Sequence, residues 1–332
     1  MAEKLIVVIG ATGNQGGSVV QTFLELAEWK IRGLTRNVGS SSAKTLQLKG
    51  VEMVSADLDD VTSLEAAFRG ASVIFAVTDF WTGFRNPANS SKVAPGQTLL
   101  EWAHDYELQQ GKNIFEAASG VKGLERLIFS ALSYATKWSK GKTPHVYHFD
   151  SEARAVEYAQ TQYPELMKKT SLIQIGMYLT NMLLMPHYQP RKDANGVYVF
   201  EAKLAPNRKI PFIATIEDTG PLTKALVDNE PGKHLLAYRE EMSFNEFAEA
   251  WGHVHGVKAT YELSGPNSGW ANLPDDIRLD IEDGAAYISE FGYDGGDPSI
   301  IHPSEVDLVL GLTYDRNVAN TGIQRSVCIS HL

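Results

Sequence analysis

The chain has 332 residues, of which 43% are hydrophobic and 21% are charged, and its formal net charge is −10. This composition indicates a globular protein with a sizeable core, and the acidic balance argues against direct binding to nucleic acid. A single cysteine, Cys328, leaves no disulfide framework or cysteine metal site within one chain and is typical of a reducing compartment. We therefore expect a cytoplasmic protein without a bound metal, with a nuclear location left open.

Targeting signals are weak in this sequence. No apolar run approaches the roughly 20 residues of a membrane helix, so we expect no membrane segment. The first apolar run begins at Leu5, and we therefore expect no signal peptide. The last three residues, Ser330-His331-Leu332, resemble the peroxisomal Ser-Lys-Leu address. Because so short a match is common by chance, a peroxisomal location is only a minor alternative.

The segment LIVVIGATGNQGG near the N-terminus organises the chain. Its apolar run, Leu5–Ile9, predicts a strand buried on both faces, and helical spacing of apolar residues predicts a helix over Gln15–Ala27. Gly10 would allow the tight turn, Gly13 the approach of a pyrophosphate, and Gly16 the packing of helix on strand. The N–H groups at the helix N-terminus would bind the phosphates. We predict a dinucleotide cradle made of Gly10, Thr12, Gly13, Asn14, Gln15 and Gly16.

The end of the second expected strand, Ile31–Thr35, bears on the choice of cofactor. Sites that select NAD usually place an acidic residue here to hold the ribose 2′-hydroxyl, whereas an arginine suits the 2′-phosphate of NADP. Arg36 takes this place with no acid beside it, and Lys44 further along could add charge. We therefore predict NADP(H), with a solvated arginine at a strand end as the alternative.

A third strand is expected over Val51–Ala56, and the residues after it are predicted to contact the adenine ring. These residues are Asp57, which could accept a hydrogen bond from the adenine amino group, and Leu58. Thr62 and Glu65 match a capping box at the start of the next helix. We assign that box a structural role only.

The fourth expected strand, Ala71–Thr78, delivers its last residue and Phe80 to the carboxyl edge of the sheet, where open α/β folds bind their ligands. Residues 81–96 lack periodicity and are rich in Gly, Pro, Asn and Ser, which predicts an irregular loop. Its aromatic residues Trp81 and Phe84 could line a substrate pocket or clamp a nicotinamide ring. Alternatively, they only anchor the loop.

Strand and helix patterns continue to alternate further along the chain. A long helix is expected over Leu99–Ser119, a strand over Arg126–Ala131, a helix over His148–Gln160 and a strand over Ser171–Ile175. This alternation predicts an α/β fold with a doubly wound parallel sheet of the Rossmann type.

The C-terminal half offers fewer signals. Met177, Tyr178 and Trp270 are candidates for lining an adaptable apolar pocket, with ordinary core packing as the alternative. Two further apolar segments, Val197–Ala202 and Lys209–Ala214, predict a hairpin-like pair of strands.

Four segments together resemble the NmrA-like family of atypical short-chain dehydrogenase/reductases. They are GATGNQGG, the TR after the second strand, FSALSYATKWSKGK and HVYHFDSEARAVEYA, and the similarity extends through IPFIATIEDTGPLTKALVDN and MSFNEFAEAWG. The resemblance implies an NAD(P)-binding domain over residues 1–180 and a smaller α/β part over residues 181–332, with a cleft between them. Segments near 210–230 would return to the first domain.

The resemblance also places the catalytic helix. Short-chain reductases usually carry a Tyr and a Lys four residues apart on one helix face, where the Lys lowers the phenol pKa. Here His148 falls at the Tyr position and Glu152 at the Lys position, so that the family pattern HFDSK reads HFDSE. This departure puts ordinary short-chain reductase chemistry in doubt.

Three interpretations of that helix stay open. His148 could be the general acid, with the Glu152 carboxylate raising its pKa. Tyr147 is the adjacent phenol, but it lies about 100° further around the helix. Alternatively, His148 and Glu152 form a pair near the surface with no role in turnover. Ser130 could polarise a substrate carbonyl or hydrogen-bond the strand edge.

The sequence thus predicts an NADP(H)-dependent reductase acting on a small hydrophobic carbonyl, imine or enone substrate, of the kind found in fungal secondary metabolism. The alternative is a catalytically silent sensor of NADP(H) that regulates a protein partner, and a pure scaffold is a third interpretation. The oligomeric state is left open.

Overall fold

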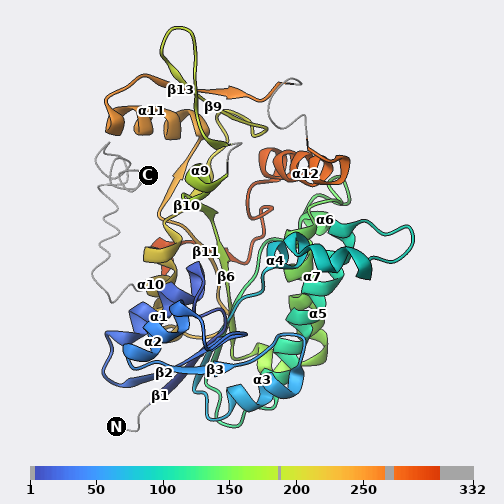
Figure 1. The fold of residues 1–332 in the computed structure, drawn as a ribbon, viewed down its shortest axis with the longest axis vertical. Coiled ribbons are helices and arrows are strands. Elements are labelled where there is room, and N and C mark those ends of the chain that lie inside the picture. The colour runs from blue at the N-terminus through green and yellow to red at the C-terminus, as the bar shows by residue number, and fades with distance from the viewer. Residues whose placement is uncertain (1–3, 186–187, 266–272, 307–332) are drawn as a thin grey trace.

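The core of the molecule is an open sheet of eight parallel strands (Figure 1), seen in a computed structural model that describes residues 4–185, 188–265 and 273–306. All neighbouring strands in it run parallel. In order across the sheet, the strands are β14 (Ile300–Ile301), β11 (His234–Ala237), β6 (Thr170–Ile175), β5 (Arg126–Ser130), β4 (Val73–Ala76), β1 (Lys4–Val8), β2 (Trp29–Thr35) and β3 (Glu52–Ser55). The doubly wound parallel sheet predicted from the alternating pattern is confirmed.

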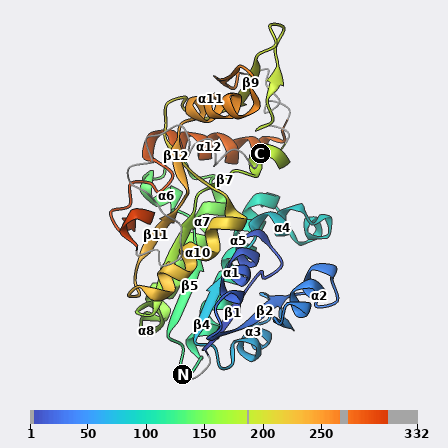
Figure 2. The same cartoon turned by 90° about the vertical axis from the view of Figure 1, so that its left-hand side faces the viewer.

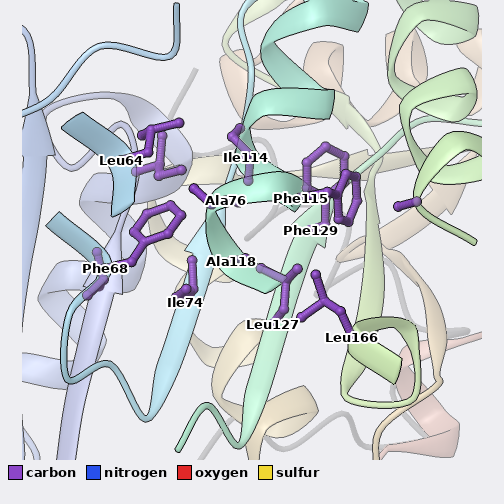
Figure 3. Close-up of a cluster of buried hydrophobic side chains, with 14 of the residues drawn as sticks. Leu64, Phe68, Ile74, Ala76, Ile114, Phe115, Ala118, Leu127, Phe129 and Leu166 are labelled. Carbon is purple, nitrogen blue, oxygen red and sulfur yellow. The ribbon is translucent and has the colours of Figure 1, made fainter. Parts of the chain in front are cut away.

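Helices cover both faces of this sheet (Figures 1 and 2). One face carries α1 (Asn14–Leu24), α2 (Ser41–Leu48) and α10 (Thr215–Asp228). The other face carries α3 (Val61–Phe68), α5 (Leu99–Ser119), α7 (Tyr147–Gln162) and α8 (Pro164–Met167). Figure 3 shows the core of this second face, where side chains from the helices meet those of β4 and β5 around Phe68, Phe115 and Phe129. Burial on both faces explains why the central strands are apolar throughout.

A smaller part of the chain lies beyond the carboxyl edge of the sheet, at the top of Figure 1. It contains two three-stranded sheets. The first comprises β7 (Met177–Tyr178), β10 (Ile210–Ile213) and β12 (Glu240–Met242), and the second β8 (Arg191–Lys192), β9 (Tyr198–Ala202) and β13 (Ala259–Leu263). Its helices are α9 (Asn181–Leu184), α11 (Phe244–His255) and α12 (Asp275–Phe291). Since β11, β14 and α10 belong to the large sheet and its layer, the chain crosses more than once between the two parts.

The segment after β4 is more regular than the sequence suggests. It forms α4 (Phe80–Arg85) and a 3-10 helix, η1 (Pro87–Lys92), so the prediction of an irregular loop over residues 81–96 is wrong for these positions. The carboxylate of Asp79 accepts from the backbone N–H of Thr82 at 3.0 Å, and Asn86 Oδ1 accepts from Ala88 N at 3.1 Å. Such side-chain caps start short helices without any apolar periodicity.

Two other local predictions are corrected by the structure. Strands β9 and β10 do not pair as a hairpin, because β10 lies between β7 and β12 and has no free edge for β9. The helix after β3 begins earlier than predicted. Its N-cap is Asp60, whose carboxylate accepts from the N–H groups of Thr62 and Ser63 at 3.0 and 3.3 Å, which leaves no capping box between Thr62 and Glu65.

Two short elements complete the described chain. They are α6 (Ala135–Trp138), which precedes α7, and the 3-10 turn η4 (Pro303–Glu305), which follows β14. Within the described ranges, no helix has the length and apolar character needed to cross a membrane.

Candidate active site

The strand order reverses at β1, which pairs with β2 on one side and with β4 on the other. Such a switch point opens a crevice at the carboxyl ends of the strands, and open α/β folds bind their ligands there. The glycine-rich turn follows β1, and Thr78 and Phe80, both buried, follow β4. Three of the sequence-predicted segments therefore surround one crevice, because Arg36 follows β2 on the same edge.

The glycine-rich turn has the geometry of a phosphate cradle. Gly10 has a φ of +66°, in the left-handed region, and its carbonyl accepts from the N–H of Gly13 at 2.8 Å. A Cβ atom on Gly16 would lie 2.6 Å from the Gly10 carbonyl carbon, so only glycine fits there. Thr12 and Asn14 are exposed, and α1 begins without a side-chain cap. The first N–H groups of α1 therefore face the crevice free to bind an anion.

The loop after β3 is fixed to helix α5. Asp57 Oδ1 accepts from the N–H of Asp59 at 3.1 Å, and the carbonyl of Leu58 accepts from Asn113 Nδ2 at 2.8 Å. The Tyr106 hydroxyl donates to Asp59 at 2.7 Å. Burial raises the pKa of Tyr106, and the charge of the exposed Arg36 acts in the opposite direction. The structure therefore places Arg36, Asp57 and Tyr106 at one end of the crevice.

Glu152 is partly buried and is held at the end of β5. Its Oε2 accepts from the backbone N–H of Leu132, just past β5, at 2.7 Å. Burial is the main cause that raises the pKa of Glu152 well above its usual range, and the nearby charges of Glu107 and Asp79 raise it further. Each of these causes favours the protonated form of the carboxyl group, which can donate a hydrogen bond.

Glu107 on α5 is a second buried carboxyl group, and the sequence reasoning missed it. Its side chain is 1% exposed and accepts a hydrogen bond from Ser151, the residue before Glu152. Burial raises its pKa to about 7, although the Ser151 hydroxyl opposes the shift. One turn further along α5, a Cβ on Gly111 would come within 2.5 Å of Ala155 Cβ. The glycine lets α5 approach α7 and so brings the two carboxyl groups together.

His148 occupies the neighbouring position on α7, where it contacts aromatic rings. Its ring centroid lies 5.2 Å from that of Trp81 and 5.9 Å from that of Phe80. Its Nδ1 is buried without a hydrogen bond and lies 3.6 Å from Oδ1 of Asp280, a 3% exposed residue of α12. Within the described chain no hydrogen bond joins His148 to Glu152, whose bond goes to Leu132.

Tyr147 and Ser130 are placed less favourably for chemistry. Tyr147 packs against the apolar cluster of Phe80, Leu100 and Ala103, and burial raises its phenol pKa to about 12. A phenol of this kind gives up its proton with difficulty. Ser130 is 4% exposed at the end of β5.

The remaining pocket candidates lie around the same crevice. Tyr178 accepts a hydrogen bond from Gln15 Nε2 at 2.8 Å, which joins the start of the smaller part to the glycine turn. Trp81 and Phe84 pack against Phe80, and Met177 packs against the core of the smaller part. Trp270 lies outside the described residues. No group of three or more potential metal ligands occurs among the residues that the structure describes.

An open parallel sheet with a glycine turn at its switch point defines an α/β protein of the Rossmann type. The chain belongs to the NmrA-like family, whose model matches residues 2–313. It is 27% identical over 270 residues to an NmrA-like family domain-containing oxidoreductase, ptmS, of Penicillium ochrochloron, covering 78% of this chain and 75% of that protein. It is 25% identical over 336 residues to the similarly named FrzB of Cladobotryum sp., covering 95% and 92%.

Solved structures show the same fold. NmrA, a negative transcriptional regulator crystallised with NADP, superposes with a TM-score of 0.67 at 20% identity, covering 86% of this chain and 82% of NmrA. The NADPH-dependent quinone oxidoreductase QOR2 of Escherichia coli, crystallised with NADPH, gives a TM-score of 0.62 at 18% identity, covering 87% and 90%. At these identities the likeness establishes the fold alone.

Proposed function

We propose that this protein is an NADP(H)-dependent reductase acting on a hydrophobic carbonyl, imine or enone substrate, of the kind used in fungal secondary metabolism. One observation carries the proposal: the glycine cradle lies at the same switch-point crevice as Glu152, whose carboxyl pKa is raised by burial. The names of the two curated relatives given above, both NmrA-like oxidoreductases, support it.

The cofactor fits the residues of the crevice. The N–H groups at the start of α1 would hold the pyrophosphate, because this helix begins without a side-chain cap and Gly16 lets it start directly against the Gly10 turn. Arg36 would pair with the 2′-phosphate, and Asp57 with Leu58 would contact the adenine. When bound, the reduced nicotinamide supplies a hydride. Thr78 and Phe80 would border the nicotinamide end, next to Glu152 and His148.

For a neutral substrate, this chain must also supply a proton. Glu152 is the stronger candidate because burial raises the pKa of its carboxyl group and so favours the protonated form. His148 is the second, since Asp280 lies 3.6 Å from its Nδ1 and would stabilise the charged imidazole.

The reductase proposal is tested with purified protein in two steps. NADPH binding is measured first by fluorescence titration. The absorbance of NADPH is then followed with hydrophobic carbonyl, imine and enone substrates. We expect turnover with at least one class and a loss of roughly a hundredfold in kcat for the variant that lacks the true proton donor, Glu152→Gln or His148→Ala. Binding of NADPH without oxidation by any of the three classes would contradict the proposal.

A redox sensor is the second candidate. The Glu152 replacement at the usual Lys position favours it, and the structural neighbour NmrA is named a negative transcriptional regulator. A protein partner captured with NADP but not with NADPH would support this function. An identical set of partners with both forms would rule it out.

A further inference from the structure

Helix α7 is capped by a side chain from the smaller part of the chain. Val146 stands at the N-cap position, and its own side chain makes no capping hydrogen bond. Asp280 of α12, which is 3% exposed, supplies an acceptor, because its Oδ1 accepts from the N–H of Tyr147 at 3.1 Å. A carboxylate here also complements the positive end of the helix dipole. Asp280 is therefore held against the start of α7.

The same oxygen of Asp280 faces His148. It lies 3.6 Å from Nδ1 of the imidazole, within the range of an ion pair. Nδ1 is buried and has no hydrogen-bond partner among the described residues. A lone pair on Nδ1 would be repelled by the carboxylate, whereas a hydrogen on Nδ1 is attracted to it. Asp280 is thus placed to fix which nitrogen of His148 carries the hydrogen.

The other side of the His148 ring is open. The side chain is 22% exposed although Nδ1 is buried, so the accessible edge is the one that carries Nε2. Phe80 and Trp81, which follow β4 at the carboxyl edge of the sheet, flank the ring with centroids 5.9 and 5.2 Å away. The ring therefore presents Nε2 beside two aromatic side chains of the kind that line pockets for hydrophobic ligands.

The surroundings of His148 bear on its charge. The ring lies on the second residue of α7, at the positive end of the helix dipole, which disfavours a charged imidazole. Of the described residues, the charged groups that face it are Asp280 from α12 and Glu107 from α5, and α4 contributes only uncharged aromatic rings. Both carboxylates favour a charged imidazole, and Asp280 does so at ion-pair distance.

We propose that Asp280 is a positioning residue, which holds His148 with a hydrogen on Nδ1 and directs Nε2 at the oxygen of a carbonyl or enone substrate. The proposal rests on the reductase function and narrows its substrate class. A charged imidazole donates to a carbonyl oxygen, whereas it repels an iminium ion, the protonated form of an imine. This role holds whether Glu152 or His148 itself supplies the proton.

The reduction balances with this arrangement. As the carbonyl carbon takes up a hydride, the π pair of the C=O bond moves to the oxygen, and the negative charge that develops there is stabilised by the imidazole. The oxygen then takes up one proton and an alcohol results. Where His148 supplies it, the Nε2–H bond breaks and the O–H bond forms. The ring is left neutral, and its remaining hydrogen stays on Nδ1 facing Asp280.

The first experiment observes the ring without turnover. Protein that contains isotope-labelled histidine is studied by heteronuclear NMR, and His148→Gln identifies the signals of His148. We expect the neutral ring to carry its hydrogen on Nδ1 in the wild type. In Asp280→Ala the form with the hydrogen on Nε2, which free histidine prefers, should become the major one. A hydrogen on Nε2 in the wild type, or the same form in both proteins, would overturn the proposal.

Asp283→Ala is the matched control. Asp283 lies one turn further along α12 and accepts from the backbone N–H and Nδ1 of His145 at 3.0 and 2.8 Å. It therefore joins α12 to the same end of α7 through a different histidine. Both variants should lower the stability, but only Asp280→Ala should change the His148 ring. The same change in both variants would show that Asp280 acts only by docking α12, and would overturn the proposal.

The pH profile of kcat separates the charge of Asp280 from its capping role. Asp280→Asn keeps an oxygen for the N–H of Tyr147 and removes the charge, and it also serves if Asp280→Ala fails to fold by circular dichroism. The charged imidazole is then lost at lower pH, so the alkaline fall of kcat should move down by about one pH unit. Asp283→Asn should leave the profile in place. A lower kcat with an unshifted profile in Asp280→Asn would reduce Asp280 to a structural cap.

The last experiment compares substrates in turnover with NADPH. Tetralone and cyclohexenone are tested beside N-methyl-dihydroisoquinolinium, an iminium ion of similar size. Reduction of the ketone or the enone in preference to the iminium ion supports the proposal. Reduction of the iminium ion alone overturns it and leaves the reductase function standing. If none is reduced although NADPH binds, the reductase function itself fails, and this proposal fails with it.

Discussion

The two ends of the crevice are built in different ways. The glycine cradle consists of consecutive residues between β1 and α1, and its shape follows from a single left-handed glycine and one close approach of backbone to backbone. The carboxyl cluster consists of Glu107 on α5 and Glu152 on α7, two helices that approach each other closely at Gly111. The cradle therefore follows from local chain geometry, whereas the cluster depends on a contact between helices far apart in the sequence.

The largest effect is expected in the cradle. In Gly16→Ala, the added Cβ would lie 2.6 Å from the Gly10 carbonyl carbon, so the turn must move. We expect NADPH affinity to fall by roughly a hundredfold or more, with about 1–3 kcal/mol of lost stability from overpacking. Gly17→Ala is the control, since its Cβ would meet the Ala11 carbonyl oxygen at 3.6 Å, an ordinary contact. Similar NADPH affinities for the two variants, by fluorescence titration, would show that the turn does not hold the cofactor.

The carboxyl cluster should reveal itself through the pH dependence of stability. The pKa of Glu107 is raised in the folded protein from 4.5 to about 7, so the folded state binds more protons than the unfolded state between these values. The free energy of unfolding should therefore fall as the pH rises from about 4.5 to about 7, by up to roughly 3 kcal/mol from this group.

Glu107→Gln should remove the part of this fall that comes from Glu107, and urea denaturation of both proteins across the same pH range measures the difference. Glu116→Gln, at an exposed position of the same helix, should retain the fall. A wild-type stability that stays level or rises through this range, after subtraction of the Glu107→Gln curve, would show that the Glu107 carboxyl group is ionised in the folded protein.

The difference between the two regions also explains what the sequence could predict. The parallel sheet, the cradle and the long helix α5 follow from local patterns, and α5 begins and ends at the predicted residues. Glu107 could not be recognised, because a single acid in an amphipathic helix looks like any solvated residue. Its burial depends on Gly111 lying against Ala155, a contact between helices far apart in the sequence. The only available signal was a glycine inside a long helix.

Asp280 was missed for the same reason, because it approaches His148 from the smaller part of the chain. At β9 and β10 the sequence predicts a contact that does not form, because two adjacent apolar segments suggest a hairpin. In the structure β10 is buried and pairs with β7 and β12, whereas β9 pairs with β8 and β13. Local rules thus predicted elements well and long-range neighbours poorly.

A smaller effect is expected at Arg36, on the relative affinities for NADPH and NADH. Arg36→Glu removes one charge-assisted contact to a 2′-phosphate, and we expect NADPH affinity to fall roughly ten- to a hundredfold, with little change for NADH. Lys122→Glu is the matched control, because this exposed lysine precedes β5 and so lies at the opposite edge of the sheet. Equal losses for NADPH and NADH in titrations of Arg36→Glu would refute the role of Arg36.

The smallest effect concerns the contact that joins the cradle to the smaller part of the chain. The Tyr178 hydroxyl accepts from Gln15 Nε2 at 2.8 Å, which connects the cradle to the first strand of the smaller part. Tyr178→Phe removes that hydrogen bond, and we expect the free energy of unfolding to fall by about 1 kcal/mol. Tyr198→Phe, at a strand on the far side of the smaller part, should change it less. If chemical denaturation shows the same stability for both variants, this hydrogen bond does not stabilise the fold, and packing alone joins the cradle to the smaller part.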